Sequence, residues 1–255
     1  MTSAVSNQAC KSFCRVIFVI YIIIHRIAKI LEMTIIALAN SKGGVGKSTL
    51  CLLIASELGQ NGASVLIVDA DPQRSCLQWV ERCKRAGTLP PSLLAVSANS
   101  PHELKVALTT ANSSIILIDV QGSINDLLIA AIVASDITLV PAKANVMEMV
   151  ETVKLFEWAQ GSLKRAPLRL LLNRVEGIDT NTAAFQDAVQ MIRDNKLAAL
   201  PTFVRARKVY EQFSKEAGSL AQIGKDPGKI EQVAKARANI VGVITDITKI
   251  ISETE

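Results

Sequence analysis

A glycine-rich run between an apolar segment and a helical segment constrains the fold of this chain more than any other feature. The run reads Ser41-Lys42-Gly43-Gly44-Val45-Gly46-Lys47-Ser48-Thr49. Its glycines let the backbone turn tightly, so that successive N–H groups can surround a phosphate at the N-terminus of the next helix. The apolar residues 34–40 before it are typical of a buried strand. A strand, a phosphate loop and a helix in this order indicate an α/β fold with a parallel sheet.

Short apolar runs and longer helical periodicities alternate along the rest of the chain. The expected strands are 34–40, 64–69, 92–96, 114–120, 136–141 and 167–173. The expected helices lie near 47–60, 73–86, 101–111, 123–134, 145–163 and 180–195. This order predicts βαβ units, and therefore a mostly parallel, twisted sheet with helices on both faces.

Composition limits the chemistry that this chain can perform. Hydrophobic residues make up 49% of it and aromatic residues only 4%, so the core must be built from Ile, Leu, Val and Ala. Five cysteines without a C-x-x-C pair favour a reduced, cytoplasmic compartment. Two histidines make a histidine-based catalytic centre or zinc site a poor interpretation. Carboxylates, lysines and a bound metal are left to carry the chemistry.

The first 33 residues differ from the rest. Residues 16–24 are apolar, but a membrane-spanning helix needs roughly 20 apolar residues, and no signal-peptide cleavage site follows the run. We favour Met33 as the true start, so that 1–33 is an N-terminal extension and 34–255 is the folded domain. Because this region is basic, an amphipathic surface anchor stays open as an alternative.

An apolar stripe runs through the expected C-terminal helix at about 228–252. Its members recur at three- and four-residue steps: Ile230, Val233, Ala236, Ile240, Ile244, Ile247 and Ile251. Core packing is the favoured interpretation, because a membrane-targeting helix would combine basic residues with bulky aromatics.

The glycine-rich run itself predicts a nucleotide site over residues 42–49. Lys47 is expected to reach the β- and γ-phosphates, and the Ser48 hydroxyl to bind Mg²⁺. The common phosphate-loop pattern has Gly where this chain has Ser41. Lys42 adds a second cation beside the glycines, which is a departure from that pattern.

Two acidic segments complete the expected site. Asp69 and Asp71 end the second strand, and Asp119 ends strand 114–120 in the pattern of a Walker B motif. Carboxylates at the C-terminal ends of parallel strands face the crevice where phosphate binds. Asp-Pro also commonly begins a helix, so one of the first two acids could serve only as a cap for a turn. Gln121 lies two positions after Asp119, and its role is open.

The run from Lys42 to Thr49 resembles the deviant Walker A motif of the ParA/MinD ATPases. The resemblance implies a three-layer P-loop NTPase fold, ATP and Mg²⁺ as cofactors, and weak, partner-stimulated ATP hydrolysis. It implies that Lys42 reaches across a dimer into the partner's ATP. It further implies that Asp71 orients the attacking water, that Asp69 and Asp119 support the Mg²⁺ shell, and that Asn173 hydrogen-bonds the adenine.

The resemblance is strongest to the small plasmid-partition ATPases of the ParF type. It rests on residues 71–75 with Trp79, on Gly122-Ser123 and on residues 207–210. It implies an ATP-dependent homodimer, with polymerisation left open, that binds DNA nonspecifically in the cytoplasm on the nucleoid. A small centromere-binding adaptor would stimulate hydrolysis. By this resemblance we expect the chain to lack the helix-turn-helix domain of larger relatives.

The DNA surface has to come from local clustering, because bulk charge is weak. The formal charge is +5, and the first 33 residues hold +3 of it. The expected DNA-binding residues are Arg193, Lys196, Arg205, Arg207 and Lys208. A solvated basic surface is an equally good interpretation of any one of them.

Three other functions fit parts of this pattern. A conjugation-associated ParA relative would share every motif. A MinD-like positioning ATPase is disfavoured by the acidic residues 253–255, so no stable membrane association is expected. A metabolic ligase of the dethiobiotin synthase type would have little use for Lys42.

Overall fold

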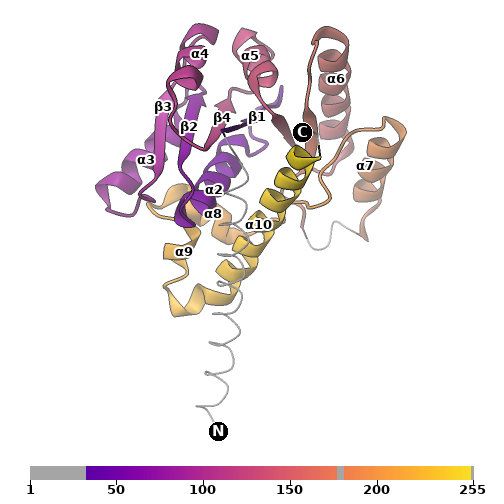
Figure 1. The fold of residues 1–255 in the computed structure, drawn as a ribbon. Coiled ribbons are helices and arrows are strands. Elements are labelled where there is room, and N and C mark those ends of the chain that lie inside the picture. Colours follow the sequence, from indigo (N-terminus) through magenta and orange to yellow (C-terminus); the bar gives the residue numbers. More distant parts are fainter. Residues whose placement is uncertain (1–32, 177–180, 254–255) are drawn as a thin grey trace.

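All six predicted strands form one parallel sheet. The computed structural model describes residues 33–176 and 181–253, so the N-terminal extension lies outside the described residues up to position 32. The strand order is β3-β2-β4-β1-β5-β6, which Figure 1 shows as the centre of the molecule. The strands are β1 (Thr34–Leu38), β2 (Val65–Ala70), β3 (Leu93–Ser97), β4 (Ile115–Val120), β5 (Ile137–Ala142) and β6 (Leu168–Leu172).

The six helices expected between these strands are also present. They are α2 (Lys47–Gln60), α3 (Ser75–Arg85), α4 (Pro101–Thr110), α5 (Asp126–Ala134), α6 (Val146–Ser162) and α7 (Ala183–Asp194). Some begin later than predicted, because a capping side chain sets the start. Asn125 Oδ1, for example, accepts a hydrogen bond from Leu128 N at 2.8 Å, so α5 begins at 126 instead of 123.

The C-terminal part contains one expected helix and two short unexpected ones. The long helix is α10 (Ile230–Ser252), preceded by the turn η2 (Pro227–Lys229). The short helices, α8 (Lys208–Lys215) and α9 (Leu220–Ile223), lie within a segment for which no element was predicted. In α8 the apolar Val209, Tyr210 and Phe213 recur at helical spacing, so they share one buried face.

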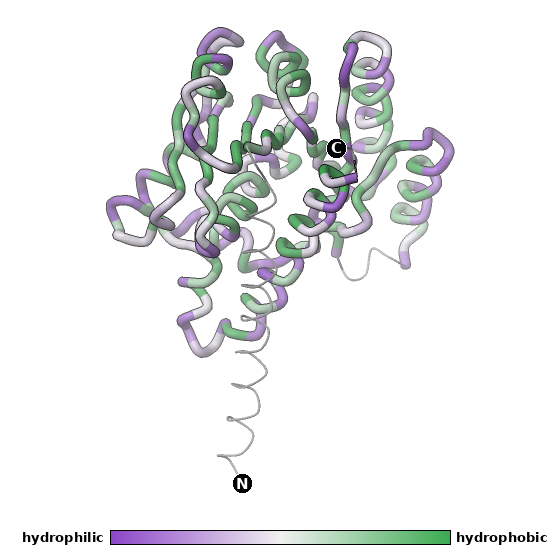
Figure 2. The backbone as a smooth tube through the Cα atoms, in the orientation of Figure 1, coloured by the Kyte–Doolittle hydropathy of each residue, from purple (hydrophilic) through white to green (hydrophobic). Residues whose placement is uncertain are grey.

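The strands other than the edge strand β3 bury their two sides in different hydrophobic clusters. In β4, Ile115 and Leu117 join the cluster under α2, α3 and α8–α10, whereas Ile116 and Ile118 join the one under α4 and α5. A third cluster lies under α6 and α7. Figure 2 shows hydrophobic residues along the strands and hydrophilic ones in the outer loops. The three-layer α/β architecture is therefore confirmed.

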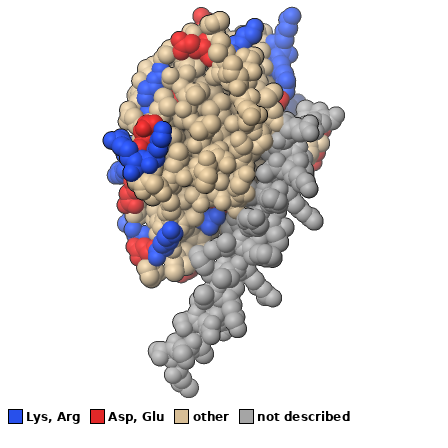
Figure 3. All heavy atoms as spheres, turned by 60° about the vertical axis from the view of Figure 1, so that its left-hand side comes forward, with Lys and Arg blue, Asp and Glu red and all other residues tan. Residues whose placement is uncertain are grey.

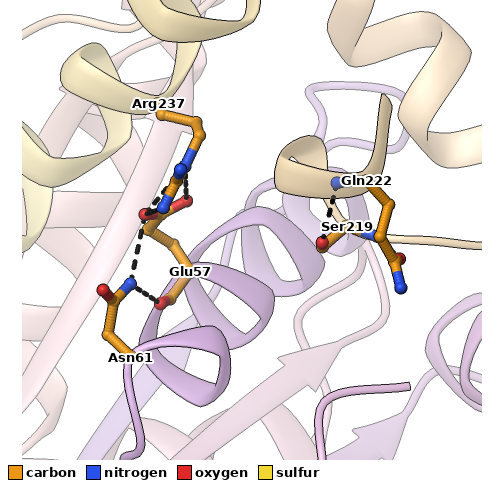
Figure 4. A network of polar contacts seen from close by, with 5 residues as sticks. All are labelled: Glu57, Asn61, Ser219, Gln222 and Arg237. Atoms are coloured by element: carbon orange, nitrogen blue, oxygen red, sulfur yellow. Dashed lines mark hydrogen bonds and ion pairs between the residues drawn. The ribbon is translucent and has the colours of Figure 1, made fainter. Parts of the chain in front are cut away.

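The apolar stripe of α10 packs into the core, as predicted. Val233, Ile240 and Ile247 are almost fully buried beside α2. The same contact contains a buried ion pair: Arg237 Nη2 donates to Glu57 Oε1 at 2.7 Å, and Arg237 Nε lies 3.0 Å from Oε2. Figure 4 shows this pair with Asn61, next to the Ser219–Gln222 cap of α9. The helix that follows the phosphate loop is thus tied to the last helix.

Strand register places the acidic residues side by side. Asp69 on β2 is paired in register with Asp119 on β4, and Asp119 in turn with Leu38 at the end of β1. Both carboxylates therefore lie at the C-terminal edge of the sheet, next to the loop that follows β1. Within residues 33–176 and 181–253, no helix is long and apolar enough to cross a membrane.

Candidate functional site

The phosphate loop is held in place at both ends by buried asparagines. Asn40 Nδ2 donates to Pro141 O at 2.7 Å, and its Oδ1 accepts from Lys42 N at 2.9 Å. Asn173 Nδ2 donates to Val45 O at 2.7 Å. Gly46 begins α2 with φ +95°, and a Cβ there would lie 2.6 Å from Asn173 Nδ2. Only glycine fits, because both the conformation and the space exclude a side chain.

The side chain of Lys47 is enclosed by the phosphate loop. Its side chain is buried, and its Nζ donates to Lys42 O at 2.9 Å. Burial lowers the pKa of Lys47, while the charges of Asp119 and Asp71 oppose this shift. The amine is therefore already next to the position that a phosphate would take, with acids nearby.

Asp119 is a buried acid, and one of its carboxylate oxygens accepts no hydrogen bond from the described residues. It is fully buried at the end of β4, and its Oδ2 accepts a hydrogen bond from Cys76 Sγ at 3.2 Å. Its Oδ1 has no partner among the described residues. Burial raises the pKa of Asp119 to about 7, and hydrogen bonds from Ser48 and Cys76 oppose the rise. A free carboxylate oxygen beside a serine hydroxyl fits Mg²⁺, which takes oxygen ligands.

Asp69 and Asp71 have different surroundings. Asp69 is fully buried, its Oδ1 accepts from Asp71 N at 3.2 Å, and its Oδ2 accepts from Leu77 N at 3.0 Å. Both oxygens therefore hold the turn and the first turn of α3, the structural role that the sequence left open for one of the two acids. Asp71 is less buried, accepts from Gln73 N at 2.8 Å, and lines the cleft beside the loop.

Two adjoining clefts follow the phosphate loop. The first, of about 700 Å³, is lined by the loop glycines with Asp71, Gln121 and Arg82. The second, of about 790 Å³, is lined by Asn173, Tyr210 and neighbouring residues. Gly46 and Arg174 line both clefts. A ligand whose phosphate end lies in the first cleft can therefore extend past Gly46 and Arg174 into the second, whose lining includes many charged side chains.

The predicted role of Asn173 stays a prediction, but its contacts are now known. Its Nδ2 is engaged by the loop, and its Oδ1 accepts from Arg174 N at 2.9 Å. The same side chain lines the second cleft. Asn173 therefore links the strand end of β6 to the phosphate loop.

The loop after β4 packs directly against the phosphate loop. A Cβ on Gly122 would lie 2.6 Å from Gly43 N and 2.7 Å from Lys42 O. No side chain fits there without displacing backbone. The end of the Walker B strand and the Lys42 peptide are thus in van der Waals contact.

The Lys42 amine is directed to a helix instead of to its own loop. Its Nζ lies 3.9 Å from Glu148 Oε1 on α6, and its side chain is 40% exposed. Glu148 is mostly buried, and its Oε2 has no partner among the described residues. Since Lys47 already occupies the loop, Lys42 is a second lysine beside the same site.

The five basic residues predicted to bind DNA are divided into two groups. Arg193 and Lys196 lie at the end of α7, whereas Arg205 and Arg207 line the second cleft and Lys208 begins α8. The segment between the groups runs along β6, with Ala199 paired to Leu170 and Arg205 to Val175. The two groups therefore lie toward opposite ends of that strand. On the face shown in Figure 3, charged side chains lie mainly along the left and upper edges of a broad area without them.

Several residues at this site were not predicted. They are Asn40, Cys76, Arg82, Glu148 and Arg174. Asn40 and Cys76 directly flank the predicted motifs, so their positions were a usable signal. Arg82 reaches the site from the C-terminal half of α3 and Glu148 from the first turn of α6, and neither belongs to a predicted motif.

Comparisons with known proteins agree with this geometry. The CobQ/CobB/MinD/ParA nucleotide-binding domain matches residues 36–221. Maintenance of carboxysome distribution protein A from Gloeobacter kilaueensis is 30% identical over 192 residues, covering 74% of this chain and 84% of that protein. The chromosome-partitioning ATPase Soj from Thermus thermophilus is 30% identical over 135 residues, covering 43% of this chain and 54% of that protein.

A solved structure shows the same fold. A putative plasmid partition protein from Borrelia burgdorferi, bound to AMPPNP, has a TM-score of 0.64 at 20% identity, covering 84% of this chain and 99% of that one. The family match covers the phosphate loop, all three aspartates and Asn173. The chain therefore belongs to the CobQ/CobB/MinD/ParA family of nucleotide-binding domains.

Proposed function

We propose that this chain is an ATP-gated switch that moves or positions DNA in the cytoplasm. ATP with Mg²⁺ binds at residues 42–49, two copies associate, and the dimer binds DNA nonspecifically. A small adaptor bound to the cargo stimulates slow hydrolysis of ATP to ADP and phosphate. Plasmid or chromosome segregation is the cargo role that the similarity to Soj supports.

The observation that carries this proposal is the position of Lys42. The phosphate loop already contains Lys47, whose amine donates to the loop carbonyl of Lys42. Lys42 holds its own amine 3.9 Å from Glu148 and partly in solvent. A lysine next to a phosphate site that already has one is suited to act on a second copy, where a positive charge stabilises phosphoryl transfer.

The remaining site residues have roles that follow from their surroundings. Lys47 neutralises the phosphates, and the backbone N–H groups of the loop orient them. Ser48 and Asp119 would hold Mg²⁺, which when bound neutralises charge on the phosphate oxygens. Asp71, at the mouth of the cleft, orients a water, and Asp69 keeps the turn that carries Asp71 in place.

Light scattering on a sizing column tests the dimer directly. The wild-type chain should elute as a monomer without nucleotide and as a dimer with a slowly hydrolysed ATP analogue and Mg²⁺. Lys42→Ala should bind the analogue yet stay monomeric. Lys154→Ala, which removes an exposed lysine on α6, is the matched control and should dimerise. If Lys42→Ala dimerises at the same protein concentration as the wild type, Lys42 does not act on the ATP of a second copy.

DNA binding is tested on the same samples. The dimer should bind DNA of unrelated sequences with similar affinity, and binding should weaken steeply as salt increases, because phosphate contacts release counterions. Separate charge reversals at Arg193 with Lys196, and at Arg205 with Lys208, show which end of β6 faces DNA. Wild-type binding by both variants would contradict a role for this set.

A protein cargo is a second candidate, which the similarity to a carboxysome-distribution protein supports. The two candidates share the nucleotide switch and differ in what is positioned. A deletion strain separates them. Increased plasmid loss supports DNA partition, whereas stable plasmids with a mislocalised protein assembly support the second candidate.

A further inference from the structure

Cys76 makes a polar contact that its burial alone does not require. It lies in the first turn of α3, which is held in place because Leu77 N donates to Asp69 Oδ2. Cys76 is fully buried, and its Sγ lies 3.2 Å from Asp119 Oδ2 and 3.8 Å from Ser48 O. One thiol is therefore in contact with both segments that would bind the metal.

This contact restrains one of the two oxygens of Asp119, alongside the hydrogen bond from Ser48. With Oδ2 engaged by the thiol, Oδ1 is the oxygen left without a partner among the described residues. A thiol is a weak donor that carries no charge, so it can orient the carboxylate without competing as a cation. Groups that hydrogen-bond a metal-binding carboxylate fix its orientation and change metal affinity when they are removed.

We propose that Cys76 is a positioning residue whose S–H group holds the Asp119 carboxylate in the orientation that binds Mg²⁺ with nucleotide. This role rests on the proposed function, because it requires that ATP bind with Mg²⁺ at Ser48 and Asp119. Cys76 neither touches the substrate nor binds the metal. It acts through Asp119 alone.

The competing explanation is that Cys76 only fills space. Buried cysteine often behaves as a small apolar residue, and Cys76 does belong to the core cluster with Cys51 and Trp79. The two explanations predict opposite orders for two substitutions. Cys76→Val keeps apolar volume and loses the donor, whereas Cys76→Ser keeps a donor and loses apolar volume.

The experiment measures binding of a fluorescent, slowly hydrolysed ATP analogue to the full chain, with Mg²⁺ titrated and with EDTA. Cys76→Val should raise the Mg²⁺ concentration at half-saturation about tenfold, the lower end of what removing such a partner costs. Its affinity for the analogue in EDTA should be unchanged. Cys76→Ser should stay within about twofold of the wild type. Cys83→Val, a buried cysteine on the same helix, should change nothing.

Two results would overturn this role alone. One is a wild-type Mg²⁺ dependence in Cys76→Val, and the other is a loss in Cys76→Ser as large as that in Cys76→Val. Nucleotide binding that ignores Mg²⁺ in the wild-type chain itself would instead overturn the proposed function together with this role. The two kinds of failure are therefore distinguishable.

Discussion

The buried ion pair between α2 and α10 makes a specific prediction about stability. Arg237 contacts both carboxylate oxygens of Glu57, and the two side chains are only 10% and 3% exposed. Arg237→Met would leave the Glu57 carboxylate buried, with Asn61 Nδ2 as a hydrogen-bond donor 3.3 Å from Oε1. Breaking a buried pair from one side costs about 3–5 kcal/mol. That is a large part of the roughly 5–15 kcal/mol that stabilises a typical domain.

Urea unfolding followed by circular dichroism measures this loss of free energy, and thermal unfolding of the same variants measures the shift in midpoint temperature. A cost of this size should lower the thermal midpoint by roughly 6–20 °C in a chain of this length. The double variant Glu57→Leu with Arg237→Met removes both charges, so it should recover most of the stability, because no buried charge stays unpaired. Lys235→Met, which breaks an exposed pair on the same helix, should leave the midpoint unchanged. A double variant as unstable as Arg237→Met would refute the reasoning.

Three further predictions concern the nucleotide site. Asp119 has a pKa of about 7 in the folded chain and about 3.9 in the unfolded chain. Between these values the folded state holds a proton that the unfolded state releases, so the free energy of unfolding should fall as pH rises from about 4 to 7. Asp119→Asn should flatten this slope and raise the nucleotide-free melting temperature at pH 8, as measured by scanning fluorimetry, and a slope parallel to that of the wild type would count against it. Gly122→Ala should weaken ATP binding at least tenfold in calorimetry, about 1.4 kcal/mol, because the new Cβ displaces the Lys42 peptide. Gly161→Ala, whose Cβ meets no atom within 4 Å, should bind normally. Asn173→Leu should lower the affinity for both ATP and ADP, because Val45 O loses its donor, and an unchanged affinity for both would contradict a role for Asn173 in holding the loop.

The fold was predictable because its signals are local. Each strand is an apolar run bounded by polar residues, and the glycine-rich loop identifies which strand comes first. The short helix α8 was missed, because its eight residues make little more than two turns and contain only three buried apolar residues. Its buried face packs against distant residues such as Trp79, whose Nε1 donates to Phe213 O across 134 positions. No local pattern reports such a contact.

The site was predictable in its residues more than in their roles. The motifs identified Asp69 and Asp71 together, but only the hydrogen bonds to Leu77 N and Asp71 N show which of the two holds the turn. The basic residues between 193 and 208 are close in sequence, yet a segment paired to β6 separates them. Residues that are close in sequence can lie far apart in space when the chain between them is extended.

The contact between Gly122 and the Lys42 peptide has a mechanical consequence. Backbone meets backbone there with no room for even a methyl group, so neither loop can shift toward the other without pushing it. The peptide that Gly122 touches carries the amine offered to a second copy. In the proposed dimer, a movement of the loop after β4 in one subunit would therefore displace the Lys42 peptide of that subunit. The Lys42 amine would then shift in the partner's active site, so the two sites would be mechanically coupled.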